Sequence, residues 1–316
     1  MTESKTRRDF LSTAGAGTVG ALTASLLSSV PAVAAPSGKG QGAGRRKGKL
    51  DFEDPQERFK LTVRRRGSLA DEPVHSFVRL HIYGYGHEGN LVPFFSMNNY
   101  AVNVWKKLPN GNHAVQVFEC GVYTAFDSYD VITEWTNPFT HELRKVHQFR
   151  SGPLNVEFGP EGIKAGPETT VKPRPMMTEV IEDSVIATTQ SSFKFPSPFQ
   201  PEEFPKESPG KIFYWDSHAT HISQVDALLD PDVASVPSQI SMTNLVSWSP
   251  WLAMSQRPGR TFGRGIGRKV KSAQALPAPV LKSLEQYMPQ VLDISKWGPP
   301  YDDIADYKEI VKAGRR

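Results

Sequence analysis

Residues 74–85 run Val74-His75-Ser76-Phe77-Val78-Arg79-Leu80-His81-Ile82-Tyr83-Gly84-Tyr85, and this stretch decides the fold. Successive side chains of a β-strand point to opposite faces, so the even and odd positions form two separate rows. The even row is mostly apolar and consists of Ser76, Val78, Leu80 and Ile82. The odd row mixes aromatic and titratable side chains and consists of His75, Phe77, Arg79, His81, Tyr83 and Tyr85. This alternation is typical of a strand and predicts a β-rich protein.

Similar short apolar segments lie on both sides of this stretch. They are residues 59–63, 91–95, 101–108, 113–123, 131–135, 143–149, 180–188 and 212–215. Pro109-Asn110-Gly111-Asn112 separates two of them and predicts a hairpin turn. Such strands predict a mainly β fold: an antiparallel sheet that forms a barrel or a barrel-like, lipocalin-like sheet, with a sandwich as the alternative. A few helices are expected near the C-terminus, at residues 277–288 and 301–313.

The N-terminus contains Thr6-Arg7-Arg8-Asp9-Phe10-Leu11, and no charged side chain follows until residue 39. Two arginines before Phe-Leu are the pattern of a twin-arginine export signal, and Ala32-Val33-Ala34 supplies the small residues at which a signal peptidase cuts. We therefore expect residues 1–34 to be a signal peptide. Its partners would be the twin-arginine export machinery and signal peptidase, and the mature protein would be periplasmic or secreted. The alternative is an uncleaved membrane anchor, which the low density of Leu, Ile and Phe disfavours.

Residues 35–50 are rich in glycine and basic side chains, and they predict a linker that cannot bury a core. Eight basic but only two acidic residues lie before residue 50, although the whole chain of 316 residues carries a formal charge of only +4. The single β-rich domain predicted for residues 51–316 is therefore close to neutral. Because nucleic-acid binding needs a basic face on the domain itself, we expect no nucleic-acid partner. Cys120 is the only cysteine, so no intramolecular disulfide can form.

The odd row of residues 75–85 is the first candidate site. A ligand pocket needs apolar area with a few orienting polar groups, and this row offers both without any Lys, Asp or Glu. We expect His75 and His81 to act as acid–base groups, Arg79 to meet an anionic group, and Tyr83 to line the pocket. The alternative is an exposed face whose aromatic side chains pair with those of neighbouring strands.

The second candidate site is the stretch Tyr214-Trp215-Asp216-Ser217-His218-Ala219-Thr220-His221. On a strand, Asp216 and His218 share a face, so Asp216 would orient His218 as a general base. On a helix, His218 and His221 would share a face instead, and imidazole with carboxylate suits zinc or iron. This His-x-x-His motif lacks the Glu and the spacing of zinc-peptidase helices. The cofactor stays unknown, and hydrogen-bonded or surface histidines are the plainer interpretation.

A third cluster of aromatic and basic residues begins with Trp248-Ser249-Pro250-Trp251-Leu252-Ala253-Met254. It could form a binding site in which an aromatic wall lies beside guanidinium groups. Trp251 is the candidate ligand-binding residue of this wall. The glycines that follow, Gly263, Gly265 and Gly267, complete neither a dinucleotide fingerprint nor a phosphate loop. Further candidate ligand-binding residues are Tyr123, Trp135 and His147. The alternative is a packed core with solvated arginines.

A family resemblance rests on several stretches of the chain. They are Arg66-Gly67-Ser68-Leu69, Pro73-Val74, Tyr83-Gly84, Gly121-Val122-Tyr123, Trp135-Thr136-Asn137-Pro138-Phe139-Thr140, residues 248–254, Pro258-Gly259 and Gly267-Arg268-Lys269. These stretches resemble a bacterial domain-of-unknown-function family, the one catalogued as 1838. The resemblance spans about residues 52–307 and departs from the family at His141-Glu142, where Gly-Glu is usual. It implies one β-rich exported domain and no particular activity.

Together these patterns predict an exported, β-barrel-like protein that binds a small, partly aromatic or apolar molecule. Acid–base chemistry by the residues named above could transform that molecule, and the sequence does not decide whether the protein is an enzyme. One alternative is a metal-dependent enzyme that uses His218 and His221. Another is a non-catalytic protein of the cell envelope.

Overall fold

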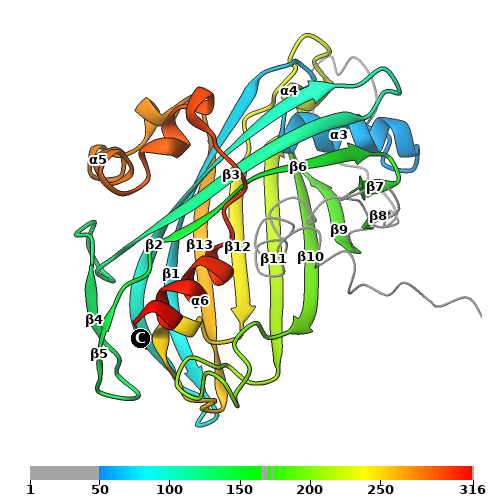
Figure 1. Cartoon of the computed structure of the whole chain (residues 1–316). Coiled ribbons are helices and arrows are strands. Elements are labelled where there is room, and N and C mark those ends of the chain that lie inside the picture. Colours follow the sequence, from blue (N-terminus) through cyan, green and yellow to red (C-terminus); the bar gives the residue numbers. More distant parts are fainter. Residues whose placement is uncertain (1–49, 165–169, 172–173, 315–316) are drawn as a thin grey trace, which may run out of the picture.

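The computed structural model describes residues 50–164, 170–171 and 174–314, and Figure 1 shows their arrangement. The signal peptide predicted for residues 1–34 lies outside the described residues, as does all of the predicted linker except Leu50. No helix within the described ranges is both long enough and apolar enough to cross a membrane.

A large antiparallel sheet forms the body of the protein (Figure 1). Its strands are β1 (Pro73–Gly86), β2 (Leu91–Lys107), β3 (His113–Thr124), β6 (Phe149–Gly159), β7 (Gly162–Lys164), β8 (Thr170–Val171), β9 (Arg174–Ile181), β10 (Ser184–Pro196), β11 (Ile212–Gln224), β12 (Gln239–Val246) and β13 (Gly259–Val270). The 11 strands lie in the order β8-β7-β6-β3-β2-β1-β13-β12-β11-β10-β9. β4 (Glu134–Thr136) and β5 (Leu143–Lys145) pair separately. The predicted mainly β, antiparallel fold with a few C-terminal helices is confirmed.

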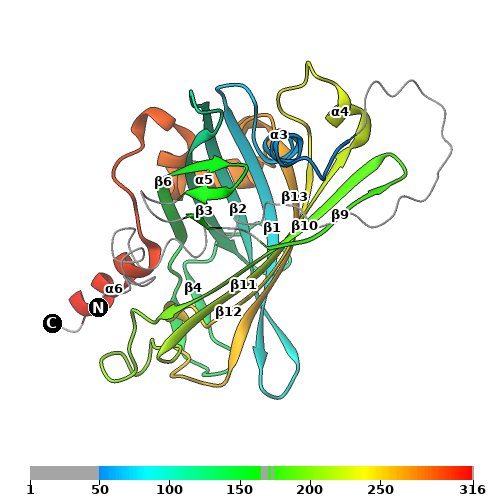
Figure 2. The same cartoon turned by 90° about the vertical axis from the view of Figure 1, so that its right-hand side faces the viewer.

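The sheet curls without closing on itself. It ends at β8 and β9, and no ladder within the described residues joins these two strands, so the predicted closed barrel is not confirmed. Figure 2 shows the curl, with β2 and β3 on one side and β10 to β12 on the other. Side chains from both sides line one interior cavity. The concave face that surrounds this cavity is called the inner face below.

Glycines of β13 let the middle of the sheet pack tightly on its inner face. Gly265 lies opposite Leu80 of β1, and Gly267 lies opposite Val78. A Cβ atom on Gly265 would come within 2.8 Å of Leu80 Cγ, and one on Gly267 within 1.9 Å of the Phe77 carbonyl oxygen. Only glycine fits such a close approach of two strands. The regular glycine spacing therefore belongs to a strand, which was not among the predicted elements.

The outer face of β2 and β3 is covered by helix α5 (Ala278–Tyr287) and by the short helices η2 (Ala273–Ala275), η3 (Pro289–Leu292) and η4 (Ile294–Lys296). Val280 and Leu284 of α5 pack against Tyr100 and Phe118, and all four side chains are almost completely buried. β3 is therefore covered on both of its faces. Its Cys120 is fully buried, and this burial raises the pKa of the thiol, as expected of an inert cysteine. The predicted helix over residues 277–288 is confirmed.

Residues 59–63 were predicted as a strand, and this prediction is wrong. They belong to helix α3 (Pro55–Arg66), whose N-cap Asp54 accepts hydrogen bonds from the amides of Gln56 and Glu57. Proline at the first position and arginines in the last turn complete the helix signals, which outweigh the short apolar alternation. Phe59 and Val63 pack on the side of β2, β3 and β6, whereas Leu61 packs on the side of β10. α3 thus lies across one end of the curled sheet (Figure 2).

Other strands have different bounds from those predicted. Residues 91–95 and 101–108 form the single strand β2, in which the buried Ser96 hydroxyl donates to the Phe126 carbonyl at 2.6 Å. Residues 180–188 contain the turn between β9 and β10, where Glu182 has a φ of 54°. Residues 143–149 include β5 and the start of β6. The hairpin at residues 109–112 is confirmed, and Gly111 has a φ of 84°.

Helix α6 (Asp303–Ala313) lies beside the start of β6, which β7 does not pair, and the helix predicted at residues 301–313 is confirmed apart from its first two residues. Gly152 of β6 and Tyr301 exchange backbone hydrogen bonds of 3.2 and 2.9 Å. Ile304 then packs against Phe195 of β10 and Phe213 of β11. The start of α6 therefore connects the two sides of the curled sheet where the strands do not.

Candidate functional site

A cavity of about 120 Å³ lies on the inner face of the sheet. It is lined by β1, β2, β3, the start of β6, β10, β11, β12 and β13, by the short helix η1 (Pro250–Leu252) and by the start of α6. Most of its surface is apolar, and Phe95, Met97, Phe195, Phe213 and Trp251 are among the residues that line it. An engineered cavity of about 150 Å³ in another protein stays dry and binds benzene, so this one suits a molecule of about one aromatic ring.

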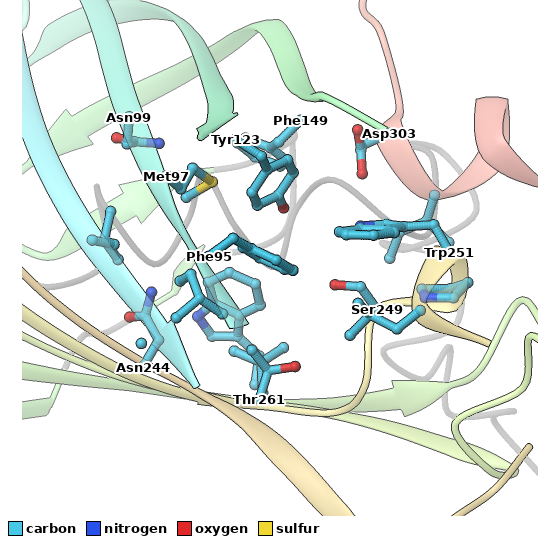
Figure 3. A pocket seen from close by; sticks show the side chains of 18 of the residues that line it. Phe95, Met97, Asn99, Tyr123, Phe149, Asn244, Ser249, Trp251, Thr261 and Asp303 are labelled. Carbon is cyan, nitrogen blue, oxygen red and sulfur yellow. The ribbon is translucent and has the colours of Figure 1, made fainter. Parts of the chain in front are cut away.

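The inner row of β2 supplies one wall of the cavity. Phe95, Met97 and Asn99 occupy alternate positions, and all three side chains point toward the cavity (Figure 3). Through the strand register Phe95 lies opposite Ile82, and Met97 lies opposite Leu80. Ile82 and Leu80 line the cavity too. The even row of β1 and the inner row of β2 therefore form a continuous apolar surface.

Trp251 forms the opposite wall. Its ring lies 5.4 Å from that of Phe95 and 5.5 Å from that of Tyr123, measured between centroids. η1 positions it: Pro250 opens this single helical turn, and Ala253 ends it in the left-handed conformation with a φ of 51°. Trp135 packs behind, with its ring 5.9 Å from that of Trp251. The cavity thus has a rigid aromatic wall, as ligand pockets often do.

One end of the cavity carries a buried polar pair. The Asn99 amide donates to Glu119 Oε1 at 2.7 Å, and the side chains of both residues line the cavity. Nearby on β12, Asn244 Oδ1 accepts from the Ser217 hydroxyl at 2.7 Å, which leaves its amide group toward the cavity. Figure 3 shows Asn99 and Asn244 on the same side of the cavity. This end can hydrogen-bond to a polar group of a bound molecule.

The other end carries a carboxylate at the start of α6. Asp303 Oδ1 lies 3.2 Å from His147 Nε2 and accepts a hydrogen bond of 3.2 Å from the Arg150 amide. Burial and this carboxylate raise the pKa of the Tyr123 phenol, against the opposing effect of a hydrogen bond from Trp251. Tyr123 is therefore protonated at neutral pH and can donate a hydrogen bond. Figure 3 shows its hydroxyl group pointing into the cavity.

Two further donors belong to residues that line the cavity from neighbouring strands. Trp215 Nε1 and the Thr261 hydroxyl are buried and have no hydrogen-bond partner among the described residues. Trp215 lies opposite Val246, which lies opposite Thr261, so the three side chains form one row across β11, β12 and β13. A buried donor without a partner costs about 1–3 kcal/mol. A ligand with an acceptor oxygen would recover that cost.

The odd row of β1 lies on the outer face, so the prediction that it lines the pocket is wrong for this cavity. His75 Nδ1 lies 2.7 Å from the Tyr100 hydroxyl, and burial lowers the pKa of this histidine. Arg79 donates to the Ser128 carbonyl at 2.7 Å. His81 lies 3.0 Å from the Ser96 hydroxyl, and Tyr83 packs against Phe126 and Phe262. The aromatic character of this row comes from packing against the loop of residues 125–130 and neighbouring strands.

The second predicted site is not assembled. Residues 212–224 form β11, so His218 is exposed on the outer face and His221 is buried on the inner face. The predicted metal pair of these two histidines is therefore wrong, because a strand places positions three apart on opposite faces. Asp216 lies 3.4 Å from Arg260 and has no contact with His218 among those described. Within the described residues no group of three or more His, Cys, Asp or Glu side chains could hold a metal ion.

The remaining candidates lie at or next to the cavity. Tyr123 and Trp251 line it, whereas Trp135 packs behind Trp251 and His147 contacts Asp303. Sequence reasoning missed the other lining side chains that carry polar atoms. They are Asn99, Glu119, Trp215, Asn244, Ser249, Thr261 and Asp303. The alternation of residues 95–99 could have indicated a shared strand face. It was obscured because two separate strands, at residues 91–95 and 101–108, were predicted where β2 is continuous.

Comparisons with known proteins give a family and no activity. The sequence model of a family described as "Protein of unknown function (DUF1838)" matches residues 79–300, a range that holds most of the cavity. No curated protein matches the chain.

Proposed function

The chain belongs to the DUF1838 family, whose description names no activity, and from the geometry of the cavity we propose that it binds a small, mainly apolar molecule there. Phe95, Met97 and Trp251 would contact the apolar body of this molecule. Burial of such a surface favours binding by about 25 cal/mol per Å² of apolar area. The proposed function is therefore binding, and any reaction would act on the molecule once it is bound.

One observation carries the proposal: Trp215 and Thr261 line an apolar cavity, and Trp215 Nε1 and the Thr261 hydroxyl are buried donors without a described partner. Buried donors are normally satisfied, and the cavity offers them few other acceptors. A ligand that fits must therefore carry an acceptor, such as a carbonyl oxygen, on an aromatic or aliphatic body. The Tyr123 phenol, which burial keeps protonated, adds a third donor.

A matched pair of small ligands tests this function. Acetophenone and ethylbenzene have nearly the same shape, but only acetophenone carries an acceptor oxygen. We expect acetophenone to change the tryptophan fluorescence and raise the melting temperature, with an affinity several-fold above that of ethylbenzene, since a net hydrogen bond is worth about 1 kcal/mol. Because both Trp251 and Trp215 line the cavity, fluorescence reports binding directly. No response to either compound would contradict the proposed binding. The remaining alternative would then be a non-catalytic protein of the cell envelope.

Acid–base conversion of the bound molecule is a second candidate function. It is favoured by the contact between His147 and Asp303, because the carboxylate lines the cavity and the histidine lies directly behind it. Asp303 could accept a proton from a bound molecule while Tyr123 donates a hydrogen bond. Conversion of a bound candidate should then fall at least about tenfold in Asp303→Asn, with binding of acetophenone retained.

We further propose that the protein is exported by the twin-arginine route and works in the periplasm or outside the cell. The supporting residues are Arg7 and Arg8 before Phe10-Leu11, and the Ala32-Val33-Ala34 stretch at which signal peptidase would cut. This route carries folded proteins, so a ligand could be bound before export.

A further inference from the structure

Four basic side chains gather where α3 meets the inner face of the sheet. They are Arg65 and Arg66 from α3, His221 from β11 and Lys269 from β13. Each of Arg66, Arg65 and Lys269 lowers the pKa of His221, after the larger effect of burial, so the three cations lie near an imidazole that is neutral at pH 7. None of the four side chains lines the cavity described above. This basic cluster is therefore a separate feature of the fold.

Arg65 is the most unusual member of the basic cluster. Only 5% of its surface is exposed, and its Nε has no hydrogen-bond partner in the described part of the chain. No carboxylate there forms an ion pair with it either. A buried guanidinium normally has both, because taking a charge out of water is costly. Burial lowers the pKa of Arg65 to about 10, so the side chain is still charged at neutral pH.

The neighbouring Arg64, in contrast, has a structural role. Arg64 donates from Nε to the Val233 carbonyl at 2.7 Å and from Nη1 to the Leu228 carbonyl at 2.5 Å. It therefore fixes α4 (Val225–Leu229) and the loop after it to α3. Arg65 makes no comparable contact with a described carbonyl. Among the described residues, its Nε group has no acceptor.

The other basic side chains of the cluster differ from Arg65. Lys269 donates to the carbonyls of Arg64 and Gly67, at 3.2 and 2.8 Å, and burial lowers its pKa to about 7. Glu72 opposes this effect of burial by raising the pKa of Lys269, so Lys269 has a carboxylate nearby, whereas no described carboxylate forms an ion pair with Arg65. His221 is 7% exposed and lies on the inner face.

We propose that the basic cluster is an oxyanion-binding site, in which the Arg65 guanidinium holds a carboxylate or a phosphate group and Lys269 adds positive charge nearby. Guanidinium binds both anions through paired hydrogen bonds, and these bonds are stronger in a buried setting. The site goes beyond the proposed apolar ligand, because neither its residues nor its chemistry belong to the cavity. An oxyanion would pair the Arg65 charge, for which no described carboxylate is a partner.

Inorganic phosphate and acetate test the proposal on the full-length chain. Melting temperature and calorimetric titration are compared with chloride at equal ionic strength. We expect phosphate or acetate, or both, to raise the melting temperature by a few degrees in a saturable manner. A response to phosphate alone identifies a phosphate site, and a response to acetate alone identifies a carboxylate site. A response equal to that in chloride would overturn the proposal.

Variants separate an anion site from a structural arginine. Arg65→Met should lose at least about tenfold in affinity for the active anion, and Arg65→Lys should be intermediate because it keeps the charge without the paired donors. Without the anion, Arg65→Met should melt at or above the wild-type temperature, since it removes an unpaired buried charge. The exposed Arg264, replaced in Arg264→Met, is the control and should bind normally. If Arg65→Met is destabilised equally with and without anion, Arg65 is structural and the proposal fails. If the Met variant does not fold, the anion affinity and melting temperature of Arg65→Lys decide between an anion site and a structural arginine.

Discussion

Trp251→Ala is expected to lower the free energy of unfolding by about 3–5 kcal/mol, the usual cost of removing a large aromatic side chain from a packed core. Trp251 is 3% exposed and contacts the rings of Phe95, Tyr123 and Trp135. Its removal would join the existing cavity to the space it vacates, so the surrounding side chains could not close the gap. For a domain of this size, the melting temperature should fall by about 10 °C. Chemical denaturation and thermal melting measure both quantities.

Trp297→Ala is the matched control for this variant. Trp297 is only half-buried and packs edge-on against Phe118 on the outer face, with ring centroids 5.4 Å apart. The same substitution there should cost clearly less. Equal losses in the two variants would show that Trp251 is not the centre of the aromatic wall.

Replacing Arg7 and Arg8 together by lysine should abolish export almost completely. The twin-arginine signal is an address that a receptor recognises, and lysine does not reproduce the planar, multiply donating guanidinium group. We expect uncleaved precursor in the cytoplasm and at least a tenfold loss of mature protein outside it, measured by cell fractionation and mass spectrometry. The mature N-terminus of the unaltered protein should begin directly after Ala34.

The control for export changes two other arginines of the same chain. Arg45 and Arg46 lie in the predicted linker, so replacing both by lysine keeps the charge and leaves the predicted signal unchanged. This variant should be exported and cleaved normally. Export of the Arg7 and Arg8 variant at the same level would contradict the twin-arginine route.

The strands in the middle of the sheet could be predicted because their patterns are local. Residues 74–85 and 113–123 alternate or run apolar within one strand, and Gly111 fixes the turn before β3. Other elements depend on competing signals. Residues 59–63 alternate like a strand, yet the cap at Asp54 and the proline after it start a helix. β13 has glycine at alternate positions, which removes the apolar pattern that identifies most strands.

The residues of the candidate site were harder to predict, because a sequence does not show which face of a strand points inward. The sequence separates the even from the odd row of β1 but does not say which row faces inward. That choice follows from the curl of the sheet and from what covers the outer face, here the loop of residues 125–130 and α5. Trp251 was found because aromatic residues are dense around it. Asn99 and Glu119 meet only through the pairing of β2 with β3, which a single sequence does not show.

If the cavity holds an apolar ligand with an acceptor, as proposed, filling the cavity with a larger side chain should abolish binding, and one pair of variants tests this. Thr261→Phe places a ring inside the cavity, because Thr261 lies on the inner face (Figure 3). Thr243→Phe makes the same change on the outer face of β12, opposite His218 and Arg264. Phenylalanine suits a strand, so both variants should fold. Calorimetric titration with acetophenone is the measurement. Thr261→Phe should lose binding while melting at or above the wild-type temperature, and Thr243→Phe should bind as the unaltered protein does. Unchanged binding in Thr261→Phe would contradict the claim.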